Sequence, residues 1–178
     1  MRLQILFLYL CKKTGMINRI IKGSILSDYK RRKVIVLLGA RQVGKTTLLS
    51  ELCEGKDRVL SLNCDNVDDV LALEGKTTTE LRQLLSSYEL VFIDEAQRVK
   101  NVGLTLKMIG DLKLETQVVV TGSSSLDMAD EINEPATGRL IEYNLFPFSL
   151  PELALYRSER EENRLLDNRM IYALDPDG

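Results

Sequence analysis

The sequence predicts an α/β fold, a three-layer sandwich built on a mainly parallel sheet. Three apolar runs, residues 34–38, 90–93 and 118–120, are continuous and rich in β-branched side chains. This pattern is typical of strands that are buried on both faces. Segments with apolar residues at helical spacing lie between these runs, so we expect helices to cover both faces of the sheet.

Gly39 to Thr46 follows the first run and reads Gly-Ala-Arg-Gln-Val-Gly-Lys-Thr, which matches the phosphate-binding loop pattern at every fixed position. Its glycines let the chain fold back so that backbone N–H groups surround a polyphosphate, and the next helix presents its positive end. Lys45 is expected to meet the β- and γ-phosphates, and the hydroxyl of Thr46 to meet Mg²⁺. An ordinary glycine-rich turn is the alternative, which the strand before the loop disfavours. The expected nucleotide contacts are Gly39, Ala40, Arg41, Gln42, Val43, Gly44, Lys45, Thr46 and Thr47.

The elements after the loop can be assigned in order. Residues 47–53 are expected to form a helix that ends before Gly55, residues 58–63 a second strand, and residues 65–69 an acidic turn. Thr77 to Glu80 has the spacing of a capping box. The apolar residues that follow it at helical spacing are Leu81, Leu84, Leu85 and Tyr88.

The run at residues 90–93 ends in Asp94 and Glu95. A charge within a strand that is buried on both faces is unfavourable, so these carboxylates are expected at the carboxyl end of the strand, where open α/β sheets bind ligands. Asp94 can then hold Mg²⁺ through water, while Glu95 points to the other side and polarises the attacking water. A solvated strand end or a helix cap is the alternative.

The remaining elements complete the sheet. Residues 99–114 are expected to be helical, residues 117–121 and 140–146 to be strands, and residues 150–156 to begin a helix. The expected inner stripe of the first helix is Leu104, Met108 and Leu112. Hydroxyl residues at 121–125 are placed to bond the γ-phosphate or the water, although a serine-rich turn is nearly as good an interpretation.

Composition limits the function classes. The 178 residues suit one compact domain, and the net charge of −2 gives no global signal for nucleic acid or an acidic membrane. The absence of histidine excludes a His-based centre, and three cysteines without a C-x-x-C pair make zinc improbable and favour a reducing, cytoplasmic setting. The apolar run at the start is too short to span a bilayer. We expect residues 1–15 to be an extension upstream of an initiator at Met16, which opens a helix.

Four motifs, in order and at the expected spacing, resemble the prokaryotic AAA+-type ATPases over about residues 16–156. They are Gly39-Ala-Arg-Gln-Val-Gly-Lys-Thr-Thr-Leu-Leu49, Phe92-Ile-Asp-Glu-Ala-Gln97, Thr121-Gly-Ser-Ser-Ser125, and Gly138-Arg139 leading into Asn144-Leu-Phe-Pro-Phe-Ser149. The resemblance implies a sheet of order 5-1-4-3-2. It assigns phosphate and Mg²⁺ binding to Lys45 and Thr46, the metal shell to Asp94, and water activation to Glu95.

The same resemblance suggests that Ser123 or Ser124 acts as the first sensor of the bound nucleotide. Arg139 is similar to the arginine that reaches the γ-phosphate of a neighbouring subunit in AAA+ rings, which implies a homo-oligomer. A surface or intramolecular ion pair is the alternative for Arg139. Members of the family usually carry a long C-terminal region of unassigned function, so residues 157–178 are interpreted as the start of a truncated one.

Three functions follow as hypotheses. The first is a Mg²⁺-dependent ATPase core that acts on an unknown macromolecular partner. The second is an ATP-binding switch or fragment with little turnover. The third, a small-molecule kinase, is disfavoured because no arginine-rich lid is evident, and a GTPase is weaker still because no Asn-Lys-x-Asp guanine reader occurs.

Overall fold

The chain divides into two units. The computed structural model describes residues 17–123, 138–158, 160 and 161. One unit consists of residues 21–147, and the other joins residues 1–20 to residues 148–178. The predicted extension at residues 1–15, the serines at 124 and 125, and all residues after 161 lie outside the described residues.

The larger unit is built on a sheet of five parallel strands among the described residues. The strands are β1 (Val34–Leu38), β2 (Val59–Asn63), β3 (Leu90–Asp94), β4 (Gln117–Gly122) and β5 (Leu140–Asn144). Their order is β2-β3-β4-β1-β5, which confirms the predicted 5-1-4-3-2 arrangement counted from the opposite edge. The strand with the phosphate-binding loop, β1, therefore lies between β4 and β5. Because all five strands are parallel, their carboxyl ends lie together along one edge of the sheet, which we call the carboxyl edge.

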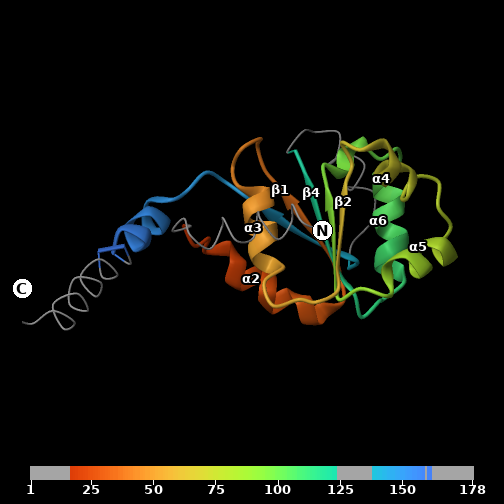
Figure 1. Ribbon diagram of the computed structural model, residues 1–178, viewed down its shortest axis with the longest axis horizontal. Helices are drawn as coiled ribbons and strands as arrows, with labels where there is room; N and C mark the ends of the chain where they lie inside the picture. Colours follow the sequence, from red (N-terminus) through yellow and green to blue (C-terminus); the bar gives the residue numbers. More distant parts are fainter. Residues whose placement is uncertain (1–16, 124–137, 159, 162–178) are drawn as a thin grey trace, which may run out of the picture. The chain divides into compact units, whose positions relative to one another are not determined.

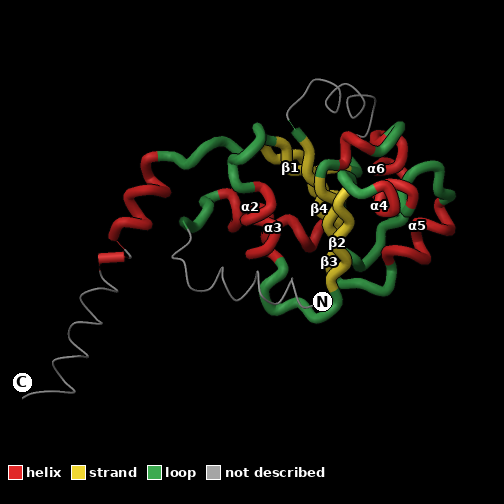
Figure 2. Tube along the Cα trace, turned by 45° about the horizontal axis from the view of Figure 1, so that its top comes forward, coloured by secondary structure: helices red, strands yellow, loops and turns green. Residues whose placement is uncertain are grey.

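Helices cover both faces of this sheet, as predicted (Figures 1 and 2). On one face lie α2 (Ile21–Asp28) and α3 (Lys45–Leu52), and on the other lie α4 (Val67–Leu71), α5 (Thr78–Leu85) and α6 (Val102–Asp111). Short 3₁₀ turns follow α2 and β3, at Tyr29–Arg31 and Ala96–Arg98.

Two apolar cores separate the layers, and β1 contributes to both because its side chains alternate between the faces. Ile35 and Leu37 pack with the leucines of α3, while Val34, Val36 and Leu38 pack with those of α5 and α6. All five β1 residues are buried, which explains why the strand reads as a continuous apolar run. The predicted inner leucines of α3, namely Leu48, Leu49 and Leu52, are confirmed in the core.

The capping box before α5 is confirmed, but the acidic turn predicted at residues 65–69 is confirmed only at residues 65 and 66, because α4 begins at Val67. Thr77 accepts the N–H of Glu80 and Glu80 accepts the N–H of Thr77. After β2, the side chain of Asn66 accepts the N–H of Asp68 and starts the short helix α4. Asp68 and Asp69 lie in its first turn, where negative charge favours a helix, so the residues that suggested a turn are helix-starting residues.

The predicted inner stripe of α6 is confirmed in part, because Leu112 is buried and Met108 packs against the core, but it is wrong at Leu104. Leu104 is 59% exposed, and the buried positions of the helix are Val102, Thr105, Leu106, Ile109 and Gly110. Gly110 of this helix packs closely against the residue that precedes β5, because an added Cβ there would lie 2.9 Å from the Cβ of Arg139. The helix expected to open at Met16 begins at Ile21, since residues 17–19 are not helical.

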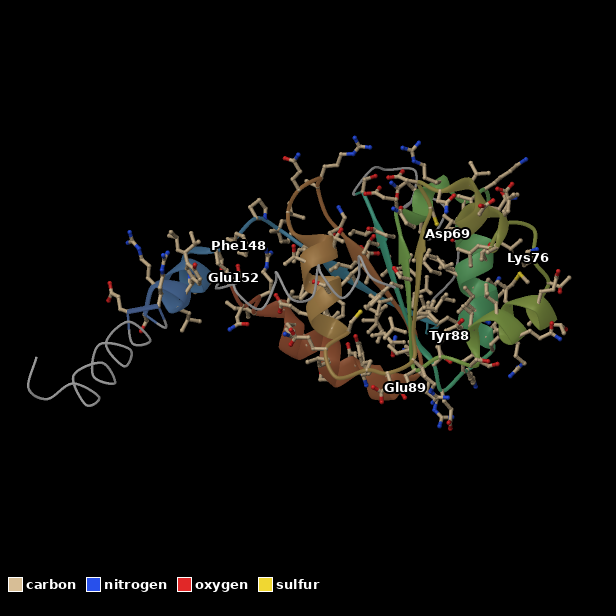
Figure 3. The ribbon with its side chains drawn as sticks, in the orientation of Figure 1. Asp69, Lys76, Tyr88, Glu89, Phe148 and Glu152 are labelled. Atoms are coloured by element: carbon tan, nitrogen blue, oxygen red, sulfur yellow. The ribbon has the colours of Figure 1, made fainter. Side chains whose placement is uncertain are left out.

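In the smaller unit, Glu152 links the two chain segments. Its carboxylate accepts the backbone N–H of Ile20 at 3.1 Å, the backbone N–H of Ser149 at 2.7 Å and the Ser149 hydroxyl at 2.9 Å. It also pairs with Arg19 at 3.2 Å, and Arg19 lies over the ring of Phe148. Figure 3 labels Phe148 and Glu152 on this segment. Ser149 and Glu152 thus form a capping box for the helix at residues 150–158.

We expect Glu152→Gln to loosen this link at neutral pH. Burial would raise the pKa of Glu152, but the hydrogen bonds from Ser149 and Ile20 and the Arg19 charge together hold it below its ordinary value of 4.5. A depressed pKa stabilises the fold above the unfolded-state value, and this contribution is lost as pH falls through the folded-state pKa. Loss of charged hydrogen bonds costs about 1.5–3 kcal/mol.

Amide hydrogen exchange measures this effect directly. The amides of Ile20 and Ser149 should exchange faster in Glu152→Gln at neutral pH, and the difference from the parent should shrink below pH 4.5. Glu54→Gln, at an exposed position in the larger unit, is the control. Unchanged protection of both amides would contradict the structural account.

Candidate functional site

The phosphate-binding loop joins the carboxyl end of β1 to the start of α3. The backbone N–H of Gly39 donates to the carbonyl of Gly122 at 3.3 Å, which fixes the start of the loop to the end of β4. Gln42 and Gly44 have φ values of +65° and +94°, and these left-handed positions turn the chain into the helix. The N–H of Leu48 then donates to the carbonyl of Gly44 at 3.0 Å and closes the first turn of α3.

Gly39 is required by close packing. A Cβ at this position would lie 2.6 Å from the backbone oxygen of Leu145 and 3.1 Å from a methyl of Val43. Leu145 is itself held beside the loop, because its N–H donates to the carbonyl of Leu38 at 2.7 Å. The beginning of the loop therefore rests directly on the backbone that follows β5.

We expect Gly39→Ala to displace the loop and to weaken ATP binding by at least about tenfold. The added methyl group overlaps a backbone atom that cannot rotate away, and overpacking of this kind costs about 1–3 kcal/mol of folding free energy. Titration with ATP and thermal unfolding would measure the two effects. Gly23→Ala is the matched control, since it lies within α2 and an added Cβ there meets nothing within 4 Å.

Lys45 is folded onto the loop. Its ammonium group donates to the carbonyls of Gly39 at 2.8 Å and Ala40 at 3.0 Å, and the residue is only 6% exposed. A buried cation is stable only where acceptors surround it. The loop therefore holds a positive charge at its centre, at the position where an anion would enter.

Asp94, at the carboxyl end of β3, connects α3 with the sheet. One carboxylate oxygen accepts the Thr46 hydroxyl at 3.3 Å, and the other accepts the hydroxyl of Thr121 from β4 and the N–H of Glu95 at 3.1 Å. Thr121 is completely buried, and its hydroxyl also accepts the N–H of Glu95 at 3.3 Å. This network fixes Asp94 beside the loop and fixes the backbone from which Glu95 projects.

Glu95 has left-handed backbone angles, φ 53° and ψ 41°, which are uncommon for a residue other than glycine and cluster at functional sites. Its carboxylate accepts a hydrogen bond from the side-chain amide of Gln97. The next residue, Ala96, is fully buried and anchors the turn.

A cavity of about 500 Å³ lies beside the phosphate-binding loop. It is lined by Arg41, Gln42, Gly44, Lys45, Thr46, Thr47, Asp65 and Glu95. Cys64 lies beside it, at the end of β2, where burial and then the charges of Asp69, Asp94, Asp65 and Glu95 raise the pKa of the thiol to about 12. The cysteine therefore remains neutral and adds no charge to the cavity.

The structure brings most of the predicted site residues to this edge of the sheet. The loop residues, Asp94 and Glu95 lie together, and Ser123 follows the carboxyl end of β4 at the same edge. Sequence reasoning did not predict the bonds of Thr121 to Asp94 and Glu95, the contact of Gln97 with Glu95, or the position of Asp65 in the cavity lining. Thr121 belongs to the hydroxyl run at residues 121–125, and Asp65 belongs to the acidic segment at residues 65–69. The sequence therefore indicated both segments but not the contacts of these two residues.

Arg139 is not brought to the site of its own chain. Its carbonyl accepts the N–H of Val34 at 3.1 Å, so it lies at the amino end of β1, whereas the loop follows the carboxyl end. Five strand residues separate the two ends, which is roughly 13 Å or more. The guanidinium of Arg139 donates to Asp111 at the end of α6. In Figure 3, Glu89 lies just before β3, at the amino ends of the strands, whereas Asp69 lies in α4, the helix that follows the carboxyl end of β2.

A strand, a glycine loop with Lys-Thr, and an Asp-Glu pair at the end of another strand of the same parallel sheet define the P-loop NTPase class. A family model described as AAA domain matches residues 31–154, so the chain belongs to the AAA domain family. The unit is thus an AAA-type P-loop ATPase core.

A solved structure titled as a DNA replication initiation factor is similar, with a TM-score of 0.47, 19% sequence identity and 85% of this chain covered. The match covers 51% of that protein, so this chain spans about half of its length. No curated protein matches. Within the part of the chain that is described, no helix is long and apolar enough to cross a membrane.

Proposed function

We propose that this core binds ATP together with Mg²⁺, hydrolyses it through Glu95, and couples the cycle to a macromolecular partner. The observation that carries the proposal is the contact between Thr46 and Asp94, which joins the phosphate-binding loop to the strand that bears Glu95. A general base within reach of the loop is what hydrolysis requires beyond binding.

The oxygens present at the site fit a magnesium ion. Mg²⁺ prefers oxygen ligands and is usually held by one or two protein side chains together with substrate phosphates. The Thr46 hydroxyl and an Asp94 carboxylate oxygen lie 3.3 Å apart and would hold the ion, with Asp94 acting directly or through water. When bound, the ion would neutralise charge on the β- and γ-phosphate oxygens.

The protein groups then have separate roles. The backbone N–H groups of residues 39–47 surround the phosphates, and Lys45 exchanges its contacts with the Gly39 and Ala40 carbonyls for β- and γ-phosphate oxygens. Water attacks the γ-phosphorus, the bond to the bridging oxygen of ADP breaks, and Glu95 accepts the proton of the water. Ser123, after β4, would contact the γ-phosphate.

A second candidate is an ATP-bound switch with little turnover as a monomer. The position of Arg139 favours it, because the arginine predicted to neutralise transition-state charge lies at the far edge of the sheet and pairs with Asp111. Rapid turnover would then need a second copy of the chain to supply Arg139. ATP turnover measured against protein concentration, with and without Mg²⁺, separates the two candidates.

Two substitutions test the contribution of Arg139. Arg139→Ala should lower turnover at high protein concentration by about 10³-fold, the scale of an arginine that acts on a transferring phosphoryl group. Asp111→Ala breaks the same ion pair and should leave turnover within about threefold. If both substitutions have the same effect, or if specific activity does not depend on concentration, Arg139 acts only within its own chain.

A further inference from the structure

We propose that Gln97 is a positioning residue for ATP hydrolysis, and that its side-chain amide holds the carboxylate of Glu95 in the direction of the attacking water. The amide nitrogen of Gln97 donates to one carboxylate oxygen of Glu95. The inference rests on the proposed function, in which Glu95 accepts the proton of that water.

The orientation of the Gln97 amide follows from the chemistry of its partner. A carboxylate only accepts hydrogen bonds, so Gln97 must present its NH₂ group to Glu95 and turn its carbonyl oxygen elsewhere. That oxygen is buried and has no hydrogen-bond partner among the described residues. A buried acceptor without a partner destabilises a fold, and such groups call for a functional explanation. The contact with Glu95 gives one.

The backbone around this pair is fixed, so the remaining freedom lies in the side chains. The N–H of Glu95 is bonded to Asp94 and Thr121, and its carbonyl accepts the N–H of Arg98 at 3.0 Å. The N–H of Val99 donates to the carbonyl of Ala96 at 2.9 Å, and both of these residues are buried. Rotation of the Glu95 side chain is the motion left to restrain, and the Gln97 amide restrains it.

This arrangement separates binding from chemistry. Glu95 lines the cavity, whereas Gln97 does not. Removing the Gln97 amide should therefore leave ATP affinity unchanged and impair only the step that uses Glu95. Misplacing a reacting group by about 1 Å can cost about 100-fold in rate.

The test combines Gln97→Met with Glu95→Gln. Methionine keeps the length of the side chain but donates no hydrogen bond, so kcat should fall about 10- to 100-fold while the Kd for ATP changes by less than about twofold. In the Glu95→Gln background, Gln97→Met should cause no further loss, because the group that it positions is already gone. Lys100→Met, at an exposed position in the following turn, is the control.

The outcomes distinguish the inference from the proposed function. If Glu95→Gln turns over ATP like the parent, the proposed function fails. If Glu95→Gln is slow but Gln97→Met keeps the parent kcat, or slows both backgrounds by the same factor, only the role of Gln97 fails. Gln97→Asn provides a second variant if the methionine variant does not fold. Its shorter amide should lose contact with Glu95 and give the same drop in kcat at unchanged Kd.

Discussion

Glu95→Gln is expected to lower ATP turnover by about 10²- to 10⁴-fold, the range of general-base catalysis, and to leave ATP binding intact. Glutamine has the shape of glutamate but cannot accept the proton of the attacking water. The residue lines the cavity beside Lys45 and Thr46, so the substitution changes the chemical step without changing the phosphate contacts of the loop. Steady-state phosphate release and calorimetric titration with ATP would measure the two quantities separately.

Glu89→Gln is a suitable control for this experiment. Glu89 lies at the amino edge of the sheet, just before β3, whereas Glu95 lies just after it (Figure 3). Both substitutions remove one carboxylate next to the same strand, so a general effect of charge on the fold would appear in both variants. Parent-like turnover in Glu95→Gln would rule out the assigned role of this glutamate.

Lys45→Met is expected to weaken ATP binding by at least about 100-fold. The ammonium group donates to two acceptors in the loop, and two hydrogen bonds from a charged group contribute about 1.5–3 kcal/mol each. Methionine fills similar space without the charge, so the loss reports on electrostatics rather than on packing. Calorimetric titration with ATP would measure the change in Kd.

The matched control is Lys56→Met. Lys56 is exposed in the loop after α3, so this substitution makes the same chemical change away from the cavity. Its ATP affinity should equal that of the parent. An unchanged affinity in Lys45→Met would show that phosphates are not held by this loop lysine, and the site would then need another cation.

Local patterns predicted much of the fold. The buried strands were predicted because continuous β-branched apolar runs are typical of strands that are buried on both faces. Helix α5 was predicted because Thr77 and Glu80 have the spacing at which each accepts the N–H group of the other. The inner stripe of α6 was wrong at Leu104, because both sides of that helix carry large apolar residues. The side of the helix that faces inward is decided by tertiary packing, and one such contact joins Gly110 to Arg139, which is distant in the sequence.

The candidate site, like the fold, was predicted only where local sequence patterns specify it. Contiguous motifs identified the loop, Asp94 and Glu95 as candidates, but the partners of these residues depend on tertiary structure. The contact of Gln97 with Glu95 requires left-handed backbone angles at Glu95, which its sequence neighbours do not specify. The position of Arg139 follows from the direction of β5, which becomes clear only when that strand is paired in parallel with β1.

The packing of Gly39 against Leu145 limits how the core can respond to nucleotide. Protein interiors are as dense as organic crystals, and here two stretches of backbone meet without a side chain between them to yield. A loop that rearranges around phosphates must therefore either keep Gly39 still or carry Leu145 with it. Leu145 lies just after β5. It precedes by three residues Phe148, the first residue of the C-terminal segment of the smaller unit. A displacement of Gly39 would therefore first move Leu145, in the segment that leads out of β5.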